Sequence, residues 1–177
     1  MARTLYVAPI PPQNATAGTA LANNTTLTDI SPAPQIVLPA NLLDVGQVLR
    51  LTAFGVFSTT VTPTLLEGFY YGGVAGIALA ATGATATASG VTNVPWRIEY
   101  EGRVRSTGTA GTIMGHGFEL RGTSVSAVGT VPIPITALAT VTIDTTTAKT
   151  LTVGAQWGTA SASNTITCHH FSAELIG

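Results

Sequence analysis

Apolar and charged residues alternate along the segment from Trp96 to Ser106. The apolar or small residues are Trp96, Ile98, Tyr100, Gly102 and Val104, and those between them are Arg97, Glu99, Glu101, Arg103 and Arg105. Successive side chains of a β-strand point to opposite faces of the sheet. The pattern therefore predicts a strand with one buried face and one charged face.

The segment from Asp44 to Ser58 predicts a second long strand, with apolar residues on both faces. One face carries Leu49, Leu51, Ala53, Gly55 and Phe57, and the other carries Val48, Arg50, Thr52, Phe54 and Val56. A strand of this kind is either central in a sandwich or buried in a contact between subunits.

Further strands are predicted between turns rich in Gly, Thr and Asn, and no segment is convincing as a helix. They cover residues 64–71, 74–81, 112–121, 141–144, 150–157 and 165–176, with loops at 82–93 and 122–130. We expect a hairpin at Gly72-Gly73, a β-bulge at His169-His170 and an edge segment at Val131–Ile135. The predicted fold is all-β, an antiparallel β-sandwich or jelly roll.

The N-terminal region has a different composition, since six of the ten prolines lie before residue 40. Proline favours extended backbone and cannot donate to a sheet. We therefore expect an extended arm over residues 1–37, followed by a sandwich domain over residues 38–177. The arm is expected to anchor on another copy or another protein rather than to join the core, with Tyr6, Val7, Ile10, Pro11 and Pro12 as the anchoring residues.

Charge is scarce, because charged residues make up 8% of the chain and the net charge is −1. Little self-repulsion keeps such chains apart, which favours a protein in contact with others. Basic residues form no stripe for a nucleic acid, and glycines and Pro95 interrupt the uncharged run 68–96, so we expect neither nucleic acid nor membrane as a partner. Cys168 is the single cysteine and no secretory signal is recognisable, which suits assembly in a cytosol.

The charged strand is expected to pair with the next one and to form a subunit interface. Glu119 and Arg121 share a parity, and a hairpin with Arg97 opposite Glu119 leaves a three-residue loop at Thr107–Thr109. The interface candidates are Arg97, Glu99, Glu101, Arg103, Arg105, Glu119, Arg121, Phe54 and Val56. If this face is buried between subunits, removing one member of an ion pair costs about 3–5 kcal/mol.

No residue pattern specifies a reaction, a metal site or a cofactor. Neighbouring strand residues point apart, so His169 and His170 need a bulge to share an ion, and His116 is expected to pack or hydrogen-bond. Glu99 and Glu101 have a spacing that a glycosidase pair could use, but the flanking arginines favour ionised carboxylates. Neither a nucleophile elbow nor a P-loop is present, and we expect no enzyme.

Three segments resemble a group of tailed-bacteriophage virion proteins: residues 38–55, beginning Leu-Pro-Ala-Asn-Leu-Leu; Pro95-Trp-Arg-Ile-Glu99; and residues 155–168, beginning Ala-Gln-Trp-Gly. The resemblance runs from about residue 38 to residue 175. It implies a jelly-roll module of the tumour-necrosis-factor type, commonly trimeric, that serves as a capsid decoration protein or as the head of a tail or head fibre.

The expected function is therefore that of a non-enzymatic virion structural protein, assembled in the host bacterial cytoplasm. We expect a homotrimeric decoration protein that binds the major capsid protein or another virion protein and stabilises the capsid exterior. The alternative is a fibre module that recognises host surface glycans, in which exposed aromatic residues such as Tyr70 or Tyr71 hold sugar. An enzyme using Glu99 and Glu101 is a third reading.

Overall fold

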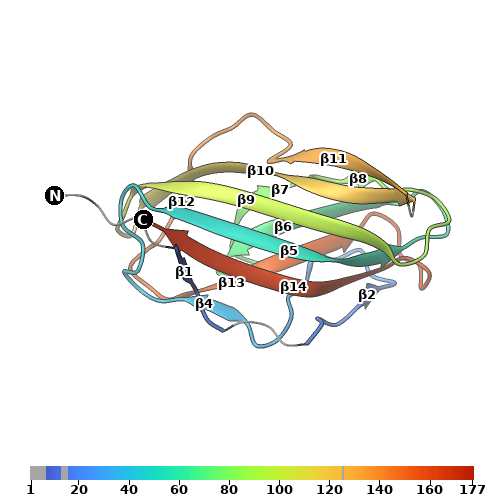
Figure 1. Cartoon of the computed structure of the whole chain (residues 1–177), viewed down its shortest axis with the longest axis horizontal. Coiled ribbons are helices and arrows are strands. Elements are labelled where there is room, and N and C mark those ends of the chain that lie inside the picture. Colours follow the sequence, from blue (N-terminus) through green and yellow to red (C-terminus); the bar gives the residue numbers. More distant parts are fainter. Residues whose placement is uncertain (1–6, 13–15, 125) are drawn as a thin grey trace.

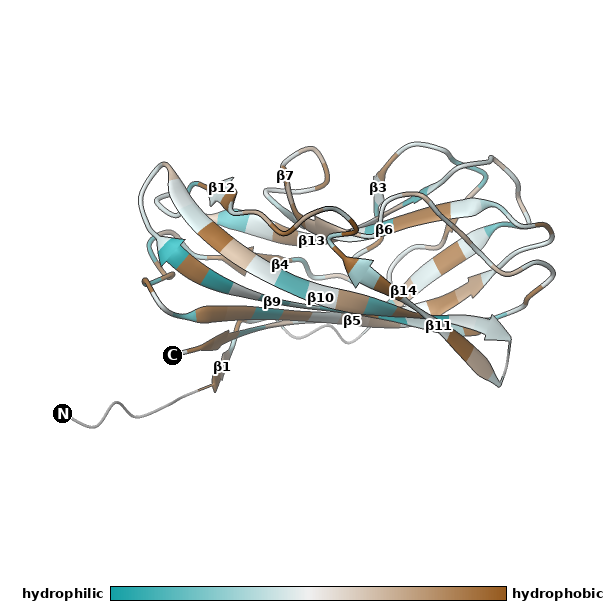
Figure 2. Ribbon diagram, turned by 90° about the horizontal axis from the view of Figure 1, so that it is seen from above, coloured by the Kyte–Doolittle hydropathy of each residue, from teal (hydrophilic) through white to brown (hydrophobic). Residues whose placement is uncertain are grey.

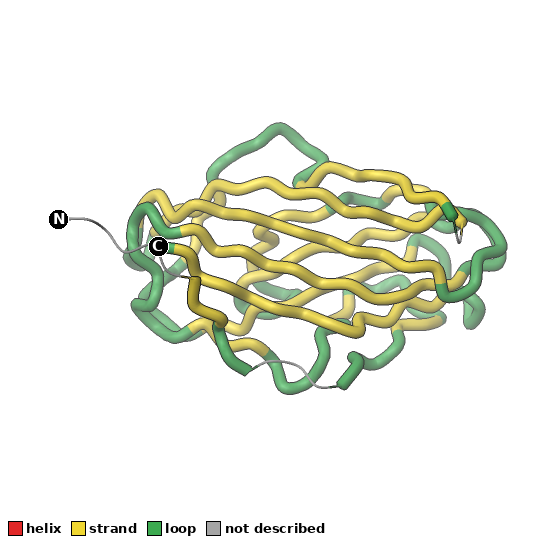
Figure 3. Tube along the Cα trace, viewed as in Figure 1, coloured by secondary structure: helices red, strands yellow, loops and turns green. Residues whose placement is uncertain are grey.

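The structure, a computed structural model, describes residues 7–12, 16–124 and 126–177. Within these ranges the chain forms strands, turns and loops, and no helix (Figure 1; Figure 3). The strands make two antiparallel sheets that pack face to face, as the view from above shows (Figure 2). The prediction of an all-β sandwich is confirmed.

The larger sheet has eight strands. Its spatial order is β1 (Val7–Pro9), β14 (Thr165–Ile176), β5 (Val48–Ser58), β9 (Val94–Ser106), β10 (Gly111–Ser124) and β11 (Ala127–Ile133), with β2 (Leu21–Ala22) beside β14 and β12 (Val141–Ile143) beside β10. The central strand β9 alternates buried and exposed residues over nearly its whole length. The predicted buried and charged faces of this strand are therefore confirmed.

The smaller sheet has six strands. Its order is β3 (Thr28–Asp29), β13 (Lys149–Trp157), β6 (Thr64–Tyr71) and β7 (Ile77–Ala81), with β4 (Ile36–Leu38) beside β13 and β8 (Thr85–Ala86) beside β6. The chain crosses repeatedly between the two sheets, so that the last strand, β14, lies between β5 and the N-terminal strands β1 and β2. β10, β11 and β12 extend the larger sheet at one edge.

The core lies between the sheets and is built by the inward residues of the long strands. Its largest side chains, all less than 2% exposed, include Trp96, Trp157, Tyr100, Phe57, Phe69 and Phe171. Phe69 of β6 and Phe171 of β14 join the two layers, with ring centres 5.8 Å apart. Burying each such side chain contributes about 1.5–3 kcal/mol, so this layer holds the sandwich together.

The N-terminal region is extended, but it packs on its own sandwich. β1 and β2 pair with β14, and β3 and β4 pair with β13. Ile10, Leu21, Ile30 and Ile36 all belong to the hydrophobic core. The expectation that this region stays outside the core is therefore wrong: its short strands hydrogen-bond to β14 or β13, and apolar residues within or next to them point inward.

Two local predictions differ in outcome. The β-bulge near the histidines of β14 is confirmed, since the pairing with β5 shifts between Cys168 and His170. The loop predicted at residues 122–130 is instead a hairpin, because β10 continues to Ser124 and β11 begins at Ala127. β11 forms one edge of the larger sheet, where Pro132 is tolerated because an edge strand need not donate on both sides.

Candidate functional site

We call the side of the larger sheet that points away from the smaller sheet the outer face. Figure 1 looks onto it, and no other segment of the described chain crosses the middle of β14, β5, β9 and β10. The register aligns one row of side chains across these four strands: His116, Glu101, Arg50 and Glu174. The charged residues of β9 thus meet charged residues of neighbouring strands.

Arg50 is the centre of this row. Its Nε donates to Glu101 Oε1 over 2.7 Å, and its Nη1 donates to Glu174 Oε2 over 3.4 Å. The hydrogen bond that Arg50 donates to Glu101 raises the pKa of Arg50 above its ordinary value. All three side chains are partly exposed, and an exposed pair stabilises a fold by only about 0–1 kcal/mol. The row therefore gives the outer face alternating charges and contributes little to the stability of the fold.

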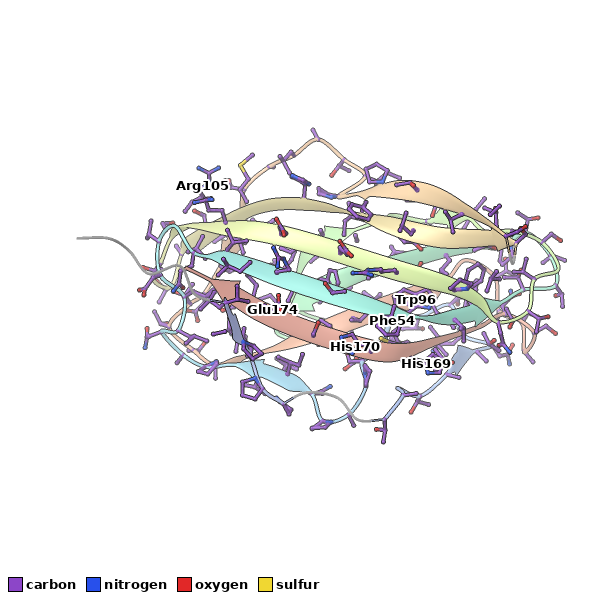
Figure 4. The ribbon with its side chains drawn as sticks, viewed as in Figure 1. Phe54, Trp96, Arg105, His169, His170 and Glu174 are labelled. Atoms are coloured by element: carbon purple, nitrogen blue, oxygen red, sulfur yellow. The ribbon has the colours of Figure 1, made fainter. Side chains whose placement is uncertain are left out.

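Aromatic and apolar groups occupy the next part of the outer face. Phe54 lies opposite Arg97 on one side and His170 on the other. Its ring stacks on the His170 imidazole with centroids 4.9 Å apart and an interplanar angle of 22° (Figure 4). Arg97 forms an ion pair with Glu99 of its own strand. Phe54 stays 45% exposed, so at this end of the outer face an exposed aromatic ring lies beside the Arg97–Glu99 ion pair.

The other end of the outer face holds a small pocket of about 240 Å³. Arg103 and Arg105 line it together with His116, Met114 and Leu138. Neither arginine has a carboxylate partner among the described residues, in contrast to Arg50. Figure 4 shows Arg105 near the end of β9, beside the loop that joins β11 to β12. This pocket is where the face carries uncompensated positive charge.

Glu119 and Arg121 do not lie on the outer face, which corrects the predicted register. Glu119 pairs with Ile98 rather than with Arg97, and Arg121 pairs with Trp96. The reason is a β-bulge near the hairpin: Thr112 pairs with Ser106 but Ile113 pairs with Val104, so Arg105 has no opposite residue. This extra residue moves Glu119 and Arg121 to the inner face, where they are 0% and 4% exposed.

On the inner face these two residues meet Glu67 of β6. Arg121 Nη2 donates to Glu67 Oε2 over 2.7 Å, and Arg121 Nε donates to Glu119 Oε1 over 2.6 Å. Arg121 Nη1 also donates to Thr85 Oγ1 of β8 over 2.8 Å. Buried charges persist when they are paired and hydrogen-bonded in this way. We call Glu67, Glu119 and Arg121 the buried charge cluster.

The buried charge cluster has two carboxyl groups for one guanidinium, so its protonation matters. Burial, followed by the charge of Glu67 and a hydrogen bond with it, raises the pKa of Glu119 to about 10, against the opposing effect of Arg121. Glu67 Oε1 is buried and has no hydrogen-bond partner among the described residues. A proton on Glu119 leaves the cluster neutral overall.

Tyr70, Tyr71 and Cys168 are all buried. Tyr70 and Tyr71 are 5% and 3% exposed, so the expectation that one of them points into solvent is wrong. Tyr70 lies across Gly154, where a Cβ atom would come within 2.7 Å of the ring, and Tyr71 Oη donates to Asp144 O. Burial raises the pKa of Cys168 to about 12. Among the described residues no three His, Cys, Asp or Glu side chains gather as a metal site.

The anchoring residues predicted in the N-terminal region differ in their exposure. Tyr6 lies outside the described residues. Val7 is 53% exposed on β1, whereas Ile10 is buried and its backbone N–H donates to Ala173 O. Pro11 lies at a groove of about 440 Å³ between the N-terminal strand and Val37, while Pro12 is half-buried. The end of the segment is thus accessible although its middle is held by the sandwich.

Sequence reasoning missed Glu67, Arg50 and Glu174 as members of charged groups. The parity of β6 contains a signal for Glu67, because this residue shares the face of the inward Leu65 and Phe69. Arg50 and Glu174 lie on outward positions of β5 and β14. Nothing local to either strand identifies their common neighbour, since the pairing of β14 with β5 joins residues 124 positions apart.

Comparison with known proteins returns no relative. No family model matches the chain, and neither a curated protein nor a solved structure is similar to it. None of the described residues belongs to a helix that is long and apolar enough to cross a membrane.

Proposed function

We propose that this chain is a non-enzymatic structural protein of a tailed-bacteriophage virion, a homotrimeric decoration protein that binds and stabilises the capsid exterior. The observation that carries the proposal is the uncovered outer face. It combines exposed Phe54 and half-buried Val56 with charges that are already paired in the chain. Protein interfaces mix apolar and polar area in this manner, with aromatic residues and arginine enriched.

A trimer with three-fold symmetry uses a heterologous contact, in which the outer face of one copy meets a different surface of the next. The edge strand β11 offers such a surface. Val128, on this strand, is 62% exposed, and the far side of the strand has no neighbour within the described chain. An open edge invites pairing or coverage by another chain, and in a closed ring of three copies the β11 edge of each copy is covered by its neighbour. Exposed Val7 and Pro11 then remain as the end that contacts the capsid protein.

The mass of the purified protein in solution tests the oligomer. Light scattering coupled to gel filtration at micromolar concentration should give one species with three times the 18.0 kDa mass of the chain. A single species at 18.0 kDa would remove the homotrimer from the proposal. Strands with apolar residues on both faces motivate the expectation, because such surface is rarely left in water.

Copy number in purified virions tests the location. Quantitative mass spectrometry against the major capsid protein should show hundreds of copies for a decoration protein. A few dozen copies or fewer would favour the alternative, a fibre module that recognises host glycans. The burial of Tyr70 and Tyr71 removes the aromatic residues first considered for that role, and the pocket at Arg103 and Arg105 is the feature that still favours it.

A further inference from the structure

The pocket on the outer face is distinguished by its two arginines. Among the described residues, Arg50, Arg97 and Arg121 all have carboxylate partners, whereas Arg103 and Arg105 have none. Their hydrogen bonds are few: Arg103 Nη1 donates to Gly46 O over 3.2 Å, and Arg105 Nη2 approaches Met114 Sδ at 3.9 Å. A guanidinium has five N–H donors, so most donors at this pocket have no acceptor in the described chain.

The backbone explains why both arginines reach one place. Neighbours two apart on a regular strand point the same way, but Arg105 is the extra residue of the β-bulge and lies opposite no residue of β10. A bulge redirects a side chain, and here the guanidinium of Arg105 comes to Met114, the residue that pairs with Arg103. Both charges therefore line the same pocket of about 240 Å³.

The remaining walls are partly apolar. Val48 of β5, Met114 of β10 and Leu138 of the loop between β11 and β12 line the pocket, and Leu138 is 48% exposed. Glu101 also lines it, but this carboxylate is held by Arg50 over 2.7 Å. The pocket thus offers two cationic forks beside aliphatic carbon, with the imidazole of His116 as a further polar group.

We propose that this pocket binds an organic carboxylate carried on a compact carbon frame, of the kind found in a uronic-acid sugar. Guanidinium groups match a carboxylate through two parallel hydrogen bonds. The aliphatic wall suits the carbon frame of such a ligand, whereas inorganic phosphate has no apolar part to place there. The volume is below that of pockets for drug-sized ligands, about 300–1,000 Å³, which limits the occupant to one small unit.

The site is separate from the part of the outer face assigned to the trimer contact. Phe54 lies opposite Arg97, and Arg103 is six residues further along β9. At about 3.3 Å per residue, the two places are roughly 20 Å apart on the strand. The proposal therefore does not depend on the oligomer: carboxylate binding by a monomer would contradict only the trimer, and a trimer without binding would contradict only this site.

The test uses sodium glucuronate as the probe and the Arg Nε–Hε signals of the ¹⁵N-labelled full chain as the readout, at constant ionic strength. Glucuronate should shift the signals of Arg103 and Arg105 with a dissociation constant on the order of millimolar, as for other small ligands. Glucose, which has the same ring without the carboxylate, should shift neither signal. The double variant R103Q/R105Q should weaken glucuronate binding about tenfold or more, since it removes both charged forks.

Arg97→Gln is the matched control, because it removes an exposed arginine from the same strand and face. It should leave glucuronate binding unchanged, and circular dichroism melting should confirm that both variants fold. The proposal is overturned if glucuronate shifts neither arginine signal or if glucose shifts them equally. Inorganic phosphate binding as tightly as glucuronate, or R103Q/R105Q binding glucuronate like the unmodified chain, would overturn it as well.

Discussion

At the scale of single residues, glutamates on the two faces of the larger sheet differ in their surroundings. Glu101 is 55% exposed and shares Arg50 with Glu174. Glu119 is fully buried and faces Glu67 as well as Arg121. Two carboxyl groups cannot both ionise beside a single buried guanidinium without a large cost. One proton therefore belongs to the folded structure.

The pH dependence of stability should report this proton. The pKa of Glu119 is about 10 in the fold against an ordinary value of 4.5, so the folded chain binds more protons than the unfolded chain between these values. Stability from this group is thus fully present below the ordinary value and is lost as pH rises toward the folded value. We expect the melting temperature to fall steadily from about pH 5 to pH 9.

Glu119→Gln replaces the protonated carboxyl by a neutral group of the same size. Its melting temperature should change much less over the same pH range, measured by circular dichroism. Glu101→Gln is the control, since it alters an exposed glutamate of the neighbouring strand and should keep the pH dependence of the unmodified protein. Equal slopes for Glu119→Gln and the unmodified protein would contradict a proton on Glu119.

At the scale of elements, the N-terminal region is part of the sandwich rather than an arm outside it. Composition favours an arm, and the strands of this region are indeed short elements of two to three residues. Yet successive residues within it point in opposite directions: Ile36 is 0% exposed and the adjacent Val37 is 44% exposed. A region that places apolar residues between the sheets at several points is a component of the sandwich and contributes to its stability.

Ile36→Ala and Val37→Ala form a matched pair on β4 for testing this role. Ile36→Ala should lower the free energy of unfolding by about 2–5 kcal/mol, because it leaves a cavity in the core. Val37→Ala should change it by less than about 0.5 kcal/mol, as is usual at exposed positions. Denaturant unfolding measures both. Similar small effects of the two changes would restore the view of an arm outside the core.

Truncation is a second test of whether the N-terminal region belongs to the core. A chain that starts near Ile36 lacks the core residues Ile10, Leu21 and Ile30. It also lacks β1 and β2, which pair with β14, and β3, which pairs with β13. We expect it to melt at a markedly lower temperature than the full chain or to be unfolded. Cooperative melting at the temperature of the full chain would contradict this expectation.

At the scale of the whole molecule, no other described segment covers the middle of the outer face of the larger sheet (Figure 1). Its apolar and paired-charge composition differs between its two ends. The Phe54 end combines a stacked aromatic pair with an ion pair, and the Arg105 end carries unpaired cations at a pocket. We assign the first to contact between copies and the second to a ligand.

Phe54→Asp should separate the proposed trimer into monomers without unfolding the sandwich. A charge at the centre of an apolar contact stays desolvated in the trimer but is solvated in the monomer, so dissociation is favoured. Light scattering measures the mass and circular dichroism confirms the fold. Val61→Asp, at a position 55% exposed in a loop, is the control and should remain trimeric. An unchanged trimer in Phe54→Asp would exclude this end of the face as the contact.

The sequence alone determined the fold class and the two faces of β5 and β9. The parity of Trp96, Ile98 and Tyr100 predicts burial correctly because side-chain alternation is a property of one extended strand and needs no partner. The bulge in β14 could also be predicted, since the apolar parity changes at His169-His170 within the same strand. Short segments between turns rich in Gly, Thr and Asn predict strands rather than helices for equally local reasons.

Only the tertiary structure decided the register between β9 and β10 and the neighbours of their charges. The bulge at Arg105 changes which residues of β10 face inward, and Arg121 finds Glu67, 54 positions away, as its partner. The N-terminal region likewise finds β14 and β13 at the opposite end of the chain. Pairing between distant segments depends on the total packing of both sheets, so no pattern within one segment contains it.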